Sequence, residues 1–262
     1  MSRKNRKKLF KNILPFAKII PNLATISALF IGMTQVKYAL KDEWEYALLA
    51  VIFAAILDAT DGRLARMLNA CSRFGAELDS LSDMVVFGVC PAIVIYLFSL
   101  SGIDRLGWVI AAFFAVCMSL RLARFNVQDI ENITTALSKY GFSVGVPAPA
   151  GAMLALAPII LYNAFGYGIF KSPYFCAIVV LASGFLCISR IPTPTIKKIH
   201  IKKENYILFL MSAIISVGLI FTYTWKALCV ILLLYIVSIF FCVSKAKKLL
   251  AENISDDQTH PH

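Results

Sequence analysis

Charged residues are scarce in this 262-residue chain: they make up 16% of it, whereas hydrophobic residues make up 59%. The mean hydropathy of +0.75 also lies far above the range of soluble globular domains. A soluble fold is therefore excluded. The composition instead predicts an integral membrane protein whose chain crosses the bilayer several times.

Histidine and paired cysteines, the usual components of zinc sites and disulfide frameworks, are almost missing. The three histidines, His200, His260 and His262, fall in predicted loops or in the C-terminal tail. The seven cysteines are odd in number, show no CxxC spacing and lie mostly within apolar runs, as small packing residues do. Histidine-based catalysis therefore has little support. A nucleic-acid partner has none, because the chain carries no motif for one.

Long apolar runs are abundant, and each is long enough to cross about 30 Å of hydrocarbon as a helix. They predict an all-α integral membrane fold with about eight transmembrane helices. The basic start, "MSRKNRKKLFKNILPFAK", reads as an amphipathic segment at the membrane surface. The predicted spans are 23–40, 46–69, 80–100, 106–125, 147–166, 174–190, 206–223 and 225–243.

Lysine and arginine are distributed very unequally among the predicted loops. If both termini are cytoplasmic, 21 of the 26 basic residues lie on the cytoplasmic side. The positive-inside rule therefore predicts this topology. We expect the membrane to be the cell (inner) membrane. The resulting basic face, part of a net charge of +11, suits contact with anionic membrane lipids.

Four aspartates interrupt this apolar sequence in the stretch "LDATDGRLARMLNACSRFGAELDSLSD", residues 57–83. At about 100° per residue, Asp58 and Asp61 share one face of the second predicted helix, and Asp79 and Asp83 share one face of the third. A short link makes these helices antiparallel neighbours. We therefore expect the four carboxylates to converge near the cytoplasmic side of the membrane.

Converging carboxylates in a membrane need a cation, since an ionised acid at mid-membrane costs about 2.5–3.5 kcal/mol. Oxygen ligands without histidine or thiol partners favour Mg²⁺ or Mn²⁺. Two such ions can stabilise charge in phosphoryl transfer. Gly62, Ala65 and Gly75 would let a headgroup approach the backbone, and Arg66 could contact a phosphate.

The same stretch matches the pattern DxxDGxxARx8GxxxDxxxD and so resembles the signature of the CDP-alcohol phosphotransferases. The resemblance implies a membrane enzyme that moves a phosphatidyl group from a CDP-linked lipid to an alcohol and releases CMP. It also implies a six-helix core and a homodimer. The chain would then divide into a basic surface segment (1–22), a catalytic domain (23–203), two additional helices (204–245) and a polar cytoplasmic tail (246–262).

The resemblance also assigns roles to individual residues. Asp58, Asp61 and Asp79 would ligate two divalent ions, and Asp83 would both ligate metal and act as the general base. The stretch "IPNLATISALFIG" resembles the first helix of the family. Residues lining the CDP-lipid site would be Asn22, Thr25, Gly62, Ala65, Arg66 and Gly75.

Three further stretches, "LRLARFN" (120–126), "GFSVGVPAPAGA" (141–152) and "SRIPTPTIKK" (189–198), resemble the phosphatidylserine-forming branch of the family. The expected substrates are then CDP-diacylglycerol and L-serine. Arg121 or Arg124 could bind the serine carboxylate, and Asn126 could add an amide contact, although the arginines could also simply end their helix.

Other readings of the sequence stay open at this point. The acceptor could be glycerol 3-phosphate, inositol phosphate or choline, and the donor could be an archaeal-type lipid. In a different class of protein, the acids could form the ion path of a cation- or proton-coupled transporter. Against a transporter, the acids are confined to two neighbouring helices.

Overall fold

The computed structural model describes residues 3–68, 70, 72–130, 142–189, 191–194 and 222–259. Helices dominate these residues, as the apolar runs predict. The predicted seventh span, 206–223, lies almost entirely outside the described residues. The main helices are α1 (Arg3–Ala39), α2 (Trp44–Met67), α3 (Arg73–Asp83), α4 (Cys90–Phe98), α5 (Asp104–Ile130), α7 (Ala148–Ala155), α8 (Ala157–Phe165), α9 (Pro173–Ile188) and α11 (Thr224–Thr259).

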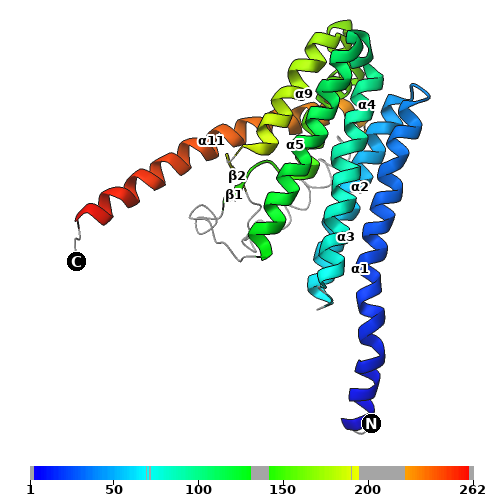
Figure 1. Ribbon diagram of the computed structural model, residues 1–262, viewed down its shortest axis with the longest axis vertical. Coiled ribbons are helices and arrows are strands. Elements are labelled where there is room, and N and C mark those ends of the chain that lie inside the picture. Colours follow the sequence, from blue (N-terminus) through cyan, green and yellow to red (C-terminus); the bar gives the residue numbers. More distant parts are fainter. Residues whose placement is uncertain are drawn as a thin grey trace.

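Helices α1 to α9 lie side by side in a bundle, whereas α11 extends away from it (Figure 1). Helix α1 is continuous from Arg3 to Ala39, so the helix does not break at residue 22, the predicted edge of the surface segment. Helix α11 likewise continues past residue 246, where the polar tail is predicted to begin. The predicted domain boundaries therefore do not coincide with helix ends at these two positions.

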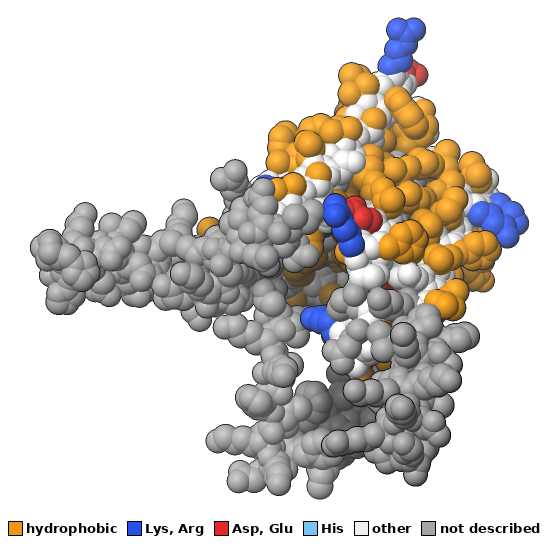
Figure 2. Space-filling model, turned by 60° about the horizontal axis from the view of Figure 1, so that its bottom comes forward, with side chains coloured by type: hydrophobic (Ala, Val, Ile, Leu, Met, Phe, Trp, Pro, Cys, Tyr) orange, Lys and Arg blue, Asp and Glu red, His pale blue; other side chains and the backbone are white. Residues whose placement is uncertain are grey.

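The core of the bundle lies between α2, α4, α5, α7 and α8. Its largest fully buried side chains include Leu48, Phe87, Ile95, Phe114 and Ile159. Elsewhere large apolar side chains face outward, among them Phe30, which is 74% exposed. In the view of Figure 2, such side chains cover much of the described surface. An apolar exterior of this kind is what a lipid-facing surface requires.

Four of the described helical stretches are long and apolar enough to cross a membrane, by length and composition. Helices α7 and α8 would make a fifth if they form one span bent by 52°. The bend lies at Leu156, next to Pro158, which cannot donate a backbone hydrogen bond. The predicted count of eight spans is therefore not confirmed. The four stretches are Ile19–Ala39, Arg73–Phe98, Leu100–Val127 and Thr224–Ser244.

The third helix begins at Arg73, seven residues before its predicted start. Ser72 caps it, because its hydroxyl oxygen accepts a hydrogen bond from the Gly75 N–H at 3.1 Å. Residues 73–79 therefore belong to the helix, although they are too polar to be predicted as part of a membrane span. A π-helical turn, η1 (Met84–Val89), separates α3 from α4 within the same span.

The all-α prediction missed one small element. Strands β1 (Phe142–Val144) and β2 (Pro192–Pro194) pair antiparallel, with Ser143 opposite Thr193. The strands have three residues each and lie about 50 residues apart, so the sequence has no alternating pattern long enough to predict them. Strand β2 contacts α11, and the pair lies beside α5 in Figure 1.

Candidate active site

The aspartates predicted to converge lie in the C-terminal halves of α2 and α3. One carboxylate oxygen each from Asp58, Asp61 and Asp79 lies within 4.8 Å of the other two. Asp83 lies one helical turn beyond Asp79, close enough to Asp58 for the two carboxyl groups to interact electrostatically. We call these four residues the aspartate cluster.

A short connection between α2 and α3 creates this arrangement. Helix α2 ends at Met67, the Ala70 N–H donates to the Ala65 carbonyl at 2.8 Å, and Ser72 then starts α3. The chain reverses within about five residues, so carboxylate oxygens of the two helices come within 4.8 Å of one another. The antiparallel pairing expected from the sequence is thus formed by a tight turn and a serine cap.

The aspartate cluster has the composition and spacing of a divalent-metal site. Its members offer only hard oxygen ligands, and Asp61 is buried while the other three are partly buried. Without a cation, carboxylates this close would repel one another at low dielectric. The residues present therefore fit a bound divalent ion, whose identity the oxygen ligands do not distinguish beyond Mg²⁺ or Mn²⁺.

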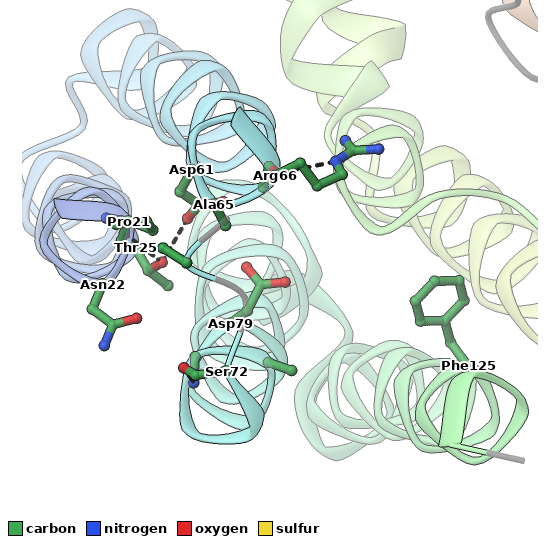
Figure 3. Close-up of a pocket in the computed structure, with 13 residues that line it drawn as sticks. Pro21, Asn22, Thr25, Asp61, Ala65, Arg66, Ser72, Asp79 and Phe125 are labelled. Carbon is green, nitrogen blue, oxygen red and sulfur yellow. Dashed lines mark hydrogen bonds between the residues drawn. The ribbon is translucent and has the colours of Figure 1, made fainter. Parts of the chain in front are cut away.

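A pocket of about 360 Å³ opens beside the aspartate cluster (Figure 3). Helices α1, α2, α3 and α5 all contribute to its wall. All six residues predicted to contact the CDP-lipid, together with Asp61 and Asp79, line it. The lining residues are Pro21, Asn22, Thr25, Asp61, Gly62, Ala65, Arg66, Ala70, Ser72, Gly75, Ala76, Asp79 and Phe125. We call this the aspartate pocket.

Polar contacts fix two of its walls relative to each other. The Thr25 hydroxyl of α1 lies 2.6 Å from Asp61 Oδ2 and can donate its proton to that carboxylate. This bond joins α1 to α2 and orients Asp61 toward the pocket (Figure 3). Asp79 points into the pocket from α3, on the opposite wall (Figure 3). The pocket therefore has carboxylates on two sides at fixed positions.

The two glycines of the pocket differ in their surroundings. A Cβ atom added at Gly62 would meet no atom within 4 Å, so packing within the described residues does not require glycine there. A Cβ at Gly75 would lie 3.1 Å from both Asn22 Oδ1 and Ser72 Oγ, so this glycine lets α3 pack closely on α1. The free space above Gly62 faces the pocket.

Arg66 is the cationic residue of the pocket wall. Its Nε atom donates to the Gly62 carbonyl at 3.0 Å, which holds the side chain against its own helix. The guanidinium is exposed, and only one of its five N–H groups takes part in this bond. Donors therefore remain for an anionic ligand such as a diphosphate.

The residues predicted to bind serine lie next to the cluster, with several of their polar groups engaged. The Nε atom of Arg121 donates to the Val146 carbonyl. The Asn126 Oδ1 atom accepts from the Ser80 hydroxyl at 3.0 Å, which ties α5 to the acidic helix. Arg121 is also close enough to Asp58 and Asp83 to interact with both electrostatically.

Arg124, by contrast, is directed toward the end of α9. Its two terminal nitrogens donate to the carbonyls of Ile188 and Ser189, at 2.8 and 3.3 Å. These bonds hold the chain that leads into β2. Of the two arginines, Arg121 is thus the one placed beside the acids, whereas Arg124 holds the backbone at the same end of the bundle.

Several lining residues were not predicted from the sequence. Ser72 could have been found from its position as a helix N-cap. Phe125 lies between Arg124 and Asn126, but the sequence did not predict that it would face the pocket from α5 (Figure 3). The small residues Ala70 and Ala76 and the helical Pro21 carry no signal of their own.

Comparisons with known proteins show the family to which the chain belongs. Residues 18–189 match the family described as CDP-alcohol phosphatidyltransferase. The chain is 36% identical to a CDP-diacylglycerol–serine O-phosphatidyltransferase of Mycobacterium leprae over 234 residues, 89% of this chain and 77% of the relative. It is 35% identical to the Helicobacter pylori protein of the same name over 221 residues, 84% of this chain and 88% of the relative.

A third relative, from Mycobacterium tuberculosis and also named as a CDP-diacylglycerol–serine O-phosphatidyltransferase, is 42% identical over 183 residues. This match covers 70% of the present chain and 62% of the relative. The family match covers the aspartate cluster and nearly every described helix except α11. The chain is therefore an integral-membrane member of the CDP-alcohol phosphatidyltransferase family.

Proposed function

We propose that this protein transfers the phosphatidyl group of CDP-diacylglycerol to L-serine, giving phosphatidylserine and CMP. The observation that carries the proposal is the aspartate pocket itself. It joins two carboxylates of the aspartate cluster, Asp61 and Asp79, to an arginine and an open glycine surface, in a chain whose relatives are named for this reaction. Family membership favours group transfer over ion transport.

Within this proposal, the aspartate cluster would hold two divalent ions, either Mg²⁺ or Mn²⁺. When bound, such ions supply stabilisation for the negative charge that develops on a transferred phosphate. The chain's own residues then position the donor: Arg66 would contact the diphosphate, and the open backbone at Gly62 would admit it. Asn22 and Thr25 of α1 would line the nucleotide site.

Asp83 is proposed as the general base. The serine oxygen forms a bond to the lipid-linked phosphorus, the bond from that phosphorus to the CMP oxygen breaks, and the serine hydroxyl proton passes to the Asp83 carboxylate. Asp83 is next to Asp58 and close to Arg121, so it lies between the acids and the proposed acceptor side. Arg121 would bind the serine carboxylate, and Asn126 would add an amide contact to serine. Arg124 would act mainly by holding the backbone near β2.

The location of the reaction is part of the same proposal. The uneven distribution of lysine and arginine supports a cytoplasmic position for both termini and for the aspartate pocket, in the cell (inner) membrane. The homodimer and the four-part domain division stay predictions from the sequence. The charged end of the bundle would then face the soluble substrate, serine, while the lipid chains of the donor remain in the bilayer.

The acceptor is tested by incubating purified protein in detergent with CDP-diacylglycerol, Mn²⁺ and single alcohols. Release of CMP and formation of phosphatidylserine are expected with serine. Glycerol 3-phosphate, inositol phosphate and choline serve as competitors, and an ether-linked CDP-lipid tests the donor. Release of CMP with another alcohol, and none with serine, would show that the acceptor assignment is wrong.

Replacing Arg121 by alanine is expected to raise the KM for serine by about 10- to 100-fold, because one charge-assisted contact is worth roughly 1.5–3 kcal/mol. The KM for CDP-diacylglycerol should change much less. Arg105→Ala is the matched control, since Arg105 lies at the start of α5, at the other end of the same helix. An equal rise in both KM values for Arg121→Ala would contradict a role in serine binding.

Gly62→Ala is expected to weaken binding of CDP-diacylglycerol without lowering the stability of the fold. The added methyl meets no protein atom, and alanine is favoured over glycine within a helix by roughly 1 kcal/mol, so the melting temperature should stay equal or rise. The KM for CDP-diacylglycerol should rise several-fold, because the methyl occupies the space left for the headgroup. Gly168→Ala, also without neighbours but far from the pocket, is the control. An unchanged donor KM would remove Gly62 from the proposed site.

A further inference from the structure

The π-helical turn that follows Asp83 leaves one backbone carbonyl without a donor from its own helix. In this turn, Met84–Val89, the N–H of Cys90 donates to the Val85 carbonyl, five residues back. It is therefore not directed to the Val86 carbonyl, four residues back. The next residue, Pro91, has no N–H to donate. The Val86 carbonyl thus lacks both its α-helical and its π-helical partner, at a position where Val86 is only 2% exposed.

Gln35 of α1 supplies the missing hydrogen bond. Its Nε2 atom donates to the Val86 carbonyl at 3.0 Å and to the Gly32 carbonyl of its own helix at 2.7 Å. Gly32 makes the approach possible, because a Cβ there would lie 2.6 Å from both methyl groups of Val86. Gln35 is fully buried and joins residues 51 positions apart in the chain.

The orientation of this amide identifies the function of the side chain. Both neighbours of Nε2 are carbonyl oxygens, so the reversed amide would place oxygen against oxygen. The Gln35 Oε1 atom is buried and has no hydrogen-bond partner among the described residues, which is unfavourable in itself. A leucine would avoid that cost. What Gln35 offers at this position is therefore its pair of N–H donors.

The π-helical turn links two halves of one span with different surroundings. The half after it is packed in the core, with Ile95 and Phe98 almost completely buried. The half before it carries Asp79 and Asp83. In an α-helix one residue corresponds to about 100° of rotation, so a register change of one residue at this turn would rotate the acids away from α2. The turn therefore sets the direction in which the two acids point.

We propose that Gln35 is a positioning residue for Asp79 and Asp83, acting through the Val86 carbonyl and the π-helical turn. It holds the register of the turn and so keeps both acids directed at Asp58 and Asp61. The expected effect on turnover rests on the proposed phosphatidyl transfer. The effects on metal affinity and on stability do not.

Gln35→Leu keeps the size of the side chain and removes the donors. We expect kcat to fall by about 10- to 100-fold, as for other residues that orient metal ligands, with much smaller changes in the two KM values. The affinity for Mn²⁺ without substrates should fall by a similar factor. It is measured by electron paramagnetic resonance, in which the signal of the free ion is lost on binding. Thr34→Val is the control, because the neighbouring Thr34 hydroxyl donates only within its own helix, to the Ile31 carbonyl at 2.6 Å.

Pro91→Ala separates this role from simple packing. Alanine has a backbone N–H at position 91, which can donate to the Val86 carbonyl if the π-helical turn is kept. If the turn relaxes to an α-helix, the Cys90 N–H donates to the same carbonyl. In both cases the Val86 carbonyl gains a donor from its own helix. Gln35→Leu should then lower the melting temperature in the wild-type background and change it little in the Pro91→Ala background. If Pro91→Ala retains activity, the loss of kcat caused by Gln35→Leu should also shrink to less than about 3-fold.

Two results would overturn the proposal. One is an unchanged Mn²⁺ affinity and kcat in Gln35→Leu. The other is an equal loss of melting temperature in both backgrounds, which would mean that Gln35 acts by packing alone. If the wild-type protein formed no phosphatidylserine, the proposed function would fail, but Mn²⁺ binding and the melting temperatures of the four proteins would still test Gln35.

Discussion

Asp83→Asn is expected to reduce kcat by about 100- to 10,000-fold, the range found when a general base is removed. A serine hydroxyl is a poor nucleophile at neutral pH, so its proton must leave as it attacks phosphorus. Asparagine keeps the size of the side chain but cannot accept this proton. The affinity for CDP-diacylglycerol should change little, because Asp83 does not line the aspartate pocket.

The measurement is a steady-state assay with both substrates varied, combined with a direct binding assay for the CDP-lipid. Asp104→Asn is the control, since Asp104 begins α5 at the opposite end of the bundle. Among the described residues, no Ser or Cys nucleophile with an adjacent base lines the aspartate pocket, which favours direct attack by serine. A lipid trapped covalently on the Asp83→Asn protein would contradict this mechanism.

The helical class of the fold and the convergence of Asp58, Asp61 and Asp79 were both predicted from the sequence. Asp58 and Asp61 are three positions apart, and Gly75, Asp79 and Asp83 follow one another at intervals of four. Helical geometry alone therefore places each set on one face. The pattern at 58–83 then relates the two faces across a short turn. Local spacing and a short connection were sufficient for this part.

Features that depend on contacts between distant segments were not predicted. The three-residue strands pair residues about 50 positions apart, and the bond from Gln35 to Val86 spans 51 positions. The π-helical turn has no signature in hydropathy, because its residues are apolar like those of α4, which follows it. Only Pro91, read together with a buried glutamine on another helix, indicates it afterwards.

The arginines show a limit of a different kind. Their charge and their position near the end of a membrane helix were visible in the sequence, but their partners were not. Arg121 and Arg124 are three positions apart, yet Arg121 lies beside the acids while Arg124 donates to the Ile188 carbonyl. Which of two neighbouring arginines faces a substrate is decided by the segments that contact them, here Val146 after β1 and the end of α9.

Removal of divalent metal is expected to abolish activity, to below about 1% of the untreated protein, because the transferred phosphate would lose its main charge stabilisation. Within the aspartate pocket, Arg66 is the only described cationic residue, and one guanidinium cannot neutralise the carboxylates of the cluster together with a diphosphate. Dialysis against a chelator, followed by addition of Mg²⁺ or Mn²⁺, should therefore stop and then restore the release of CMP.

Metal binding should also be visible without turnover. Carboxylates that lie within 4.8 Å of one another repel when ionised, so Mn²⁺ should raise the melting temperature of the chelator-treated protein. Asp58→Asn removes one ligand and part of this repulsion, so we expect the metal-free melting temperature to stay equal or rise and the stabilisation by Mn²⁺ to shrink. Full activity in metal-free buffer, or equal stabilisation of wild type and Asp58→Asn by Mn²⁺, would show that the cluster is not the metal site. Because the second readout needs no substrate, it tests the metal site even if the acceptor proves to be an alcohol other than serine.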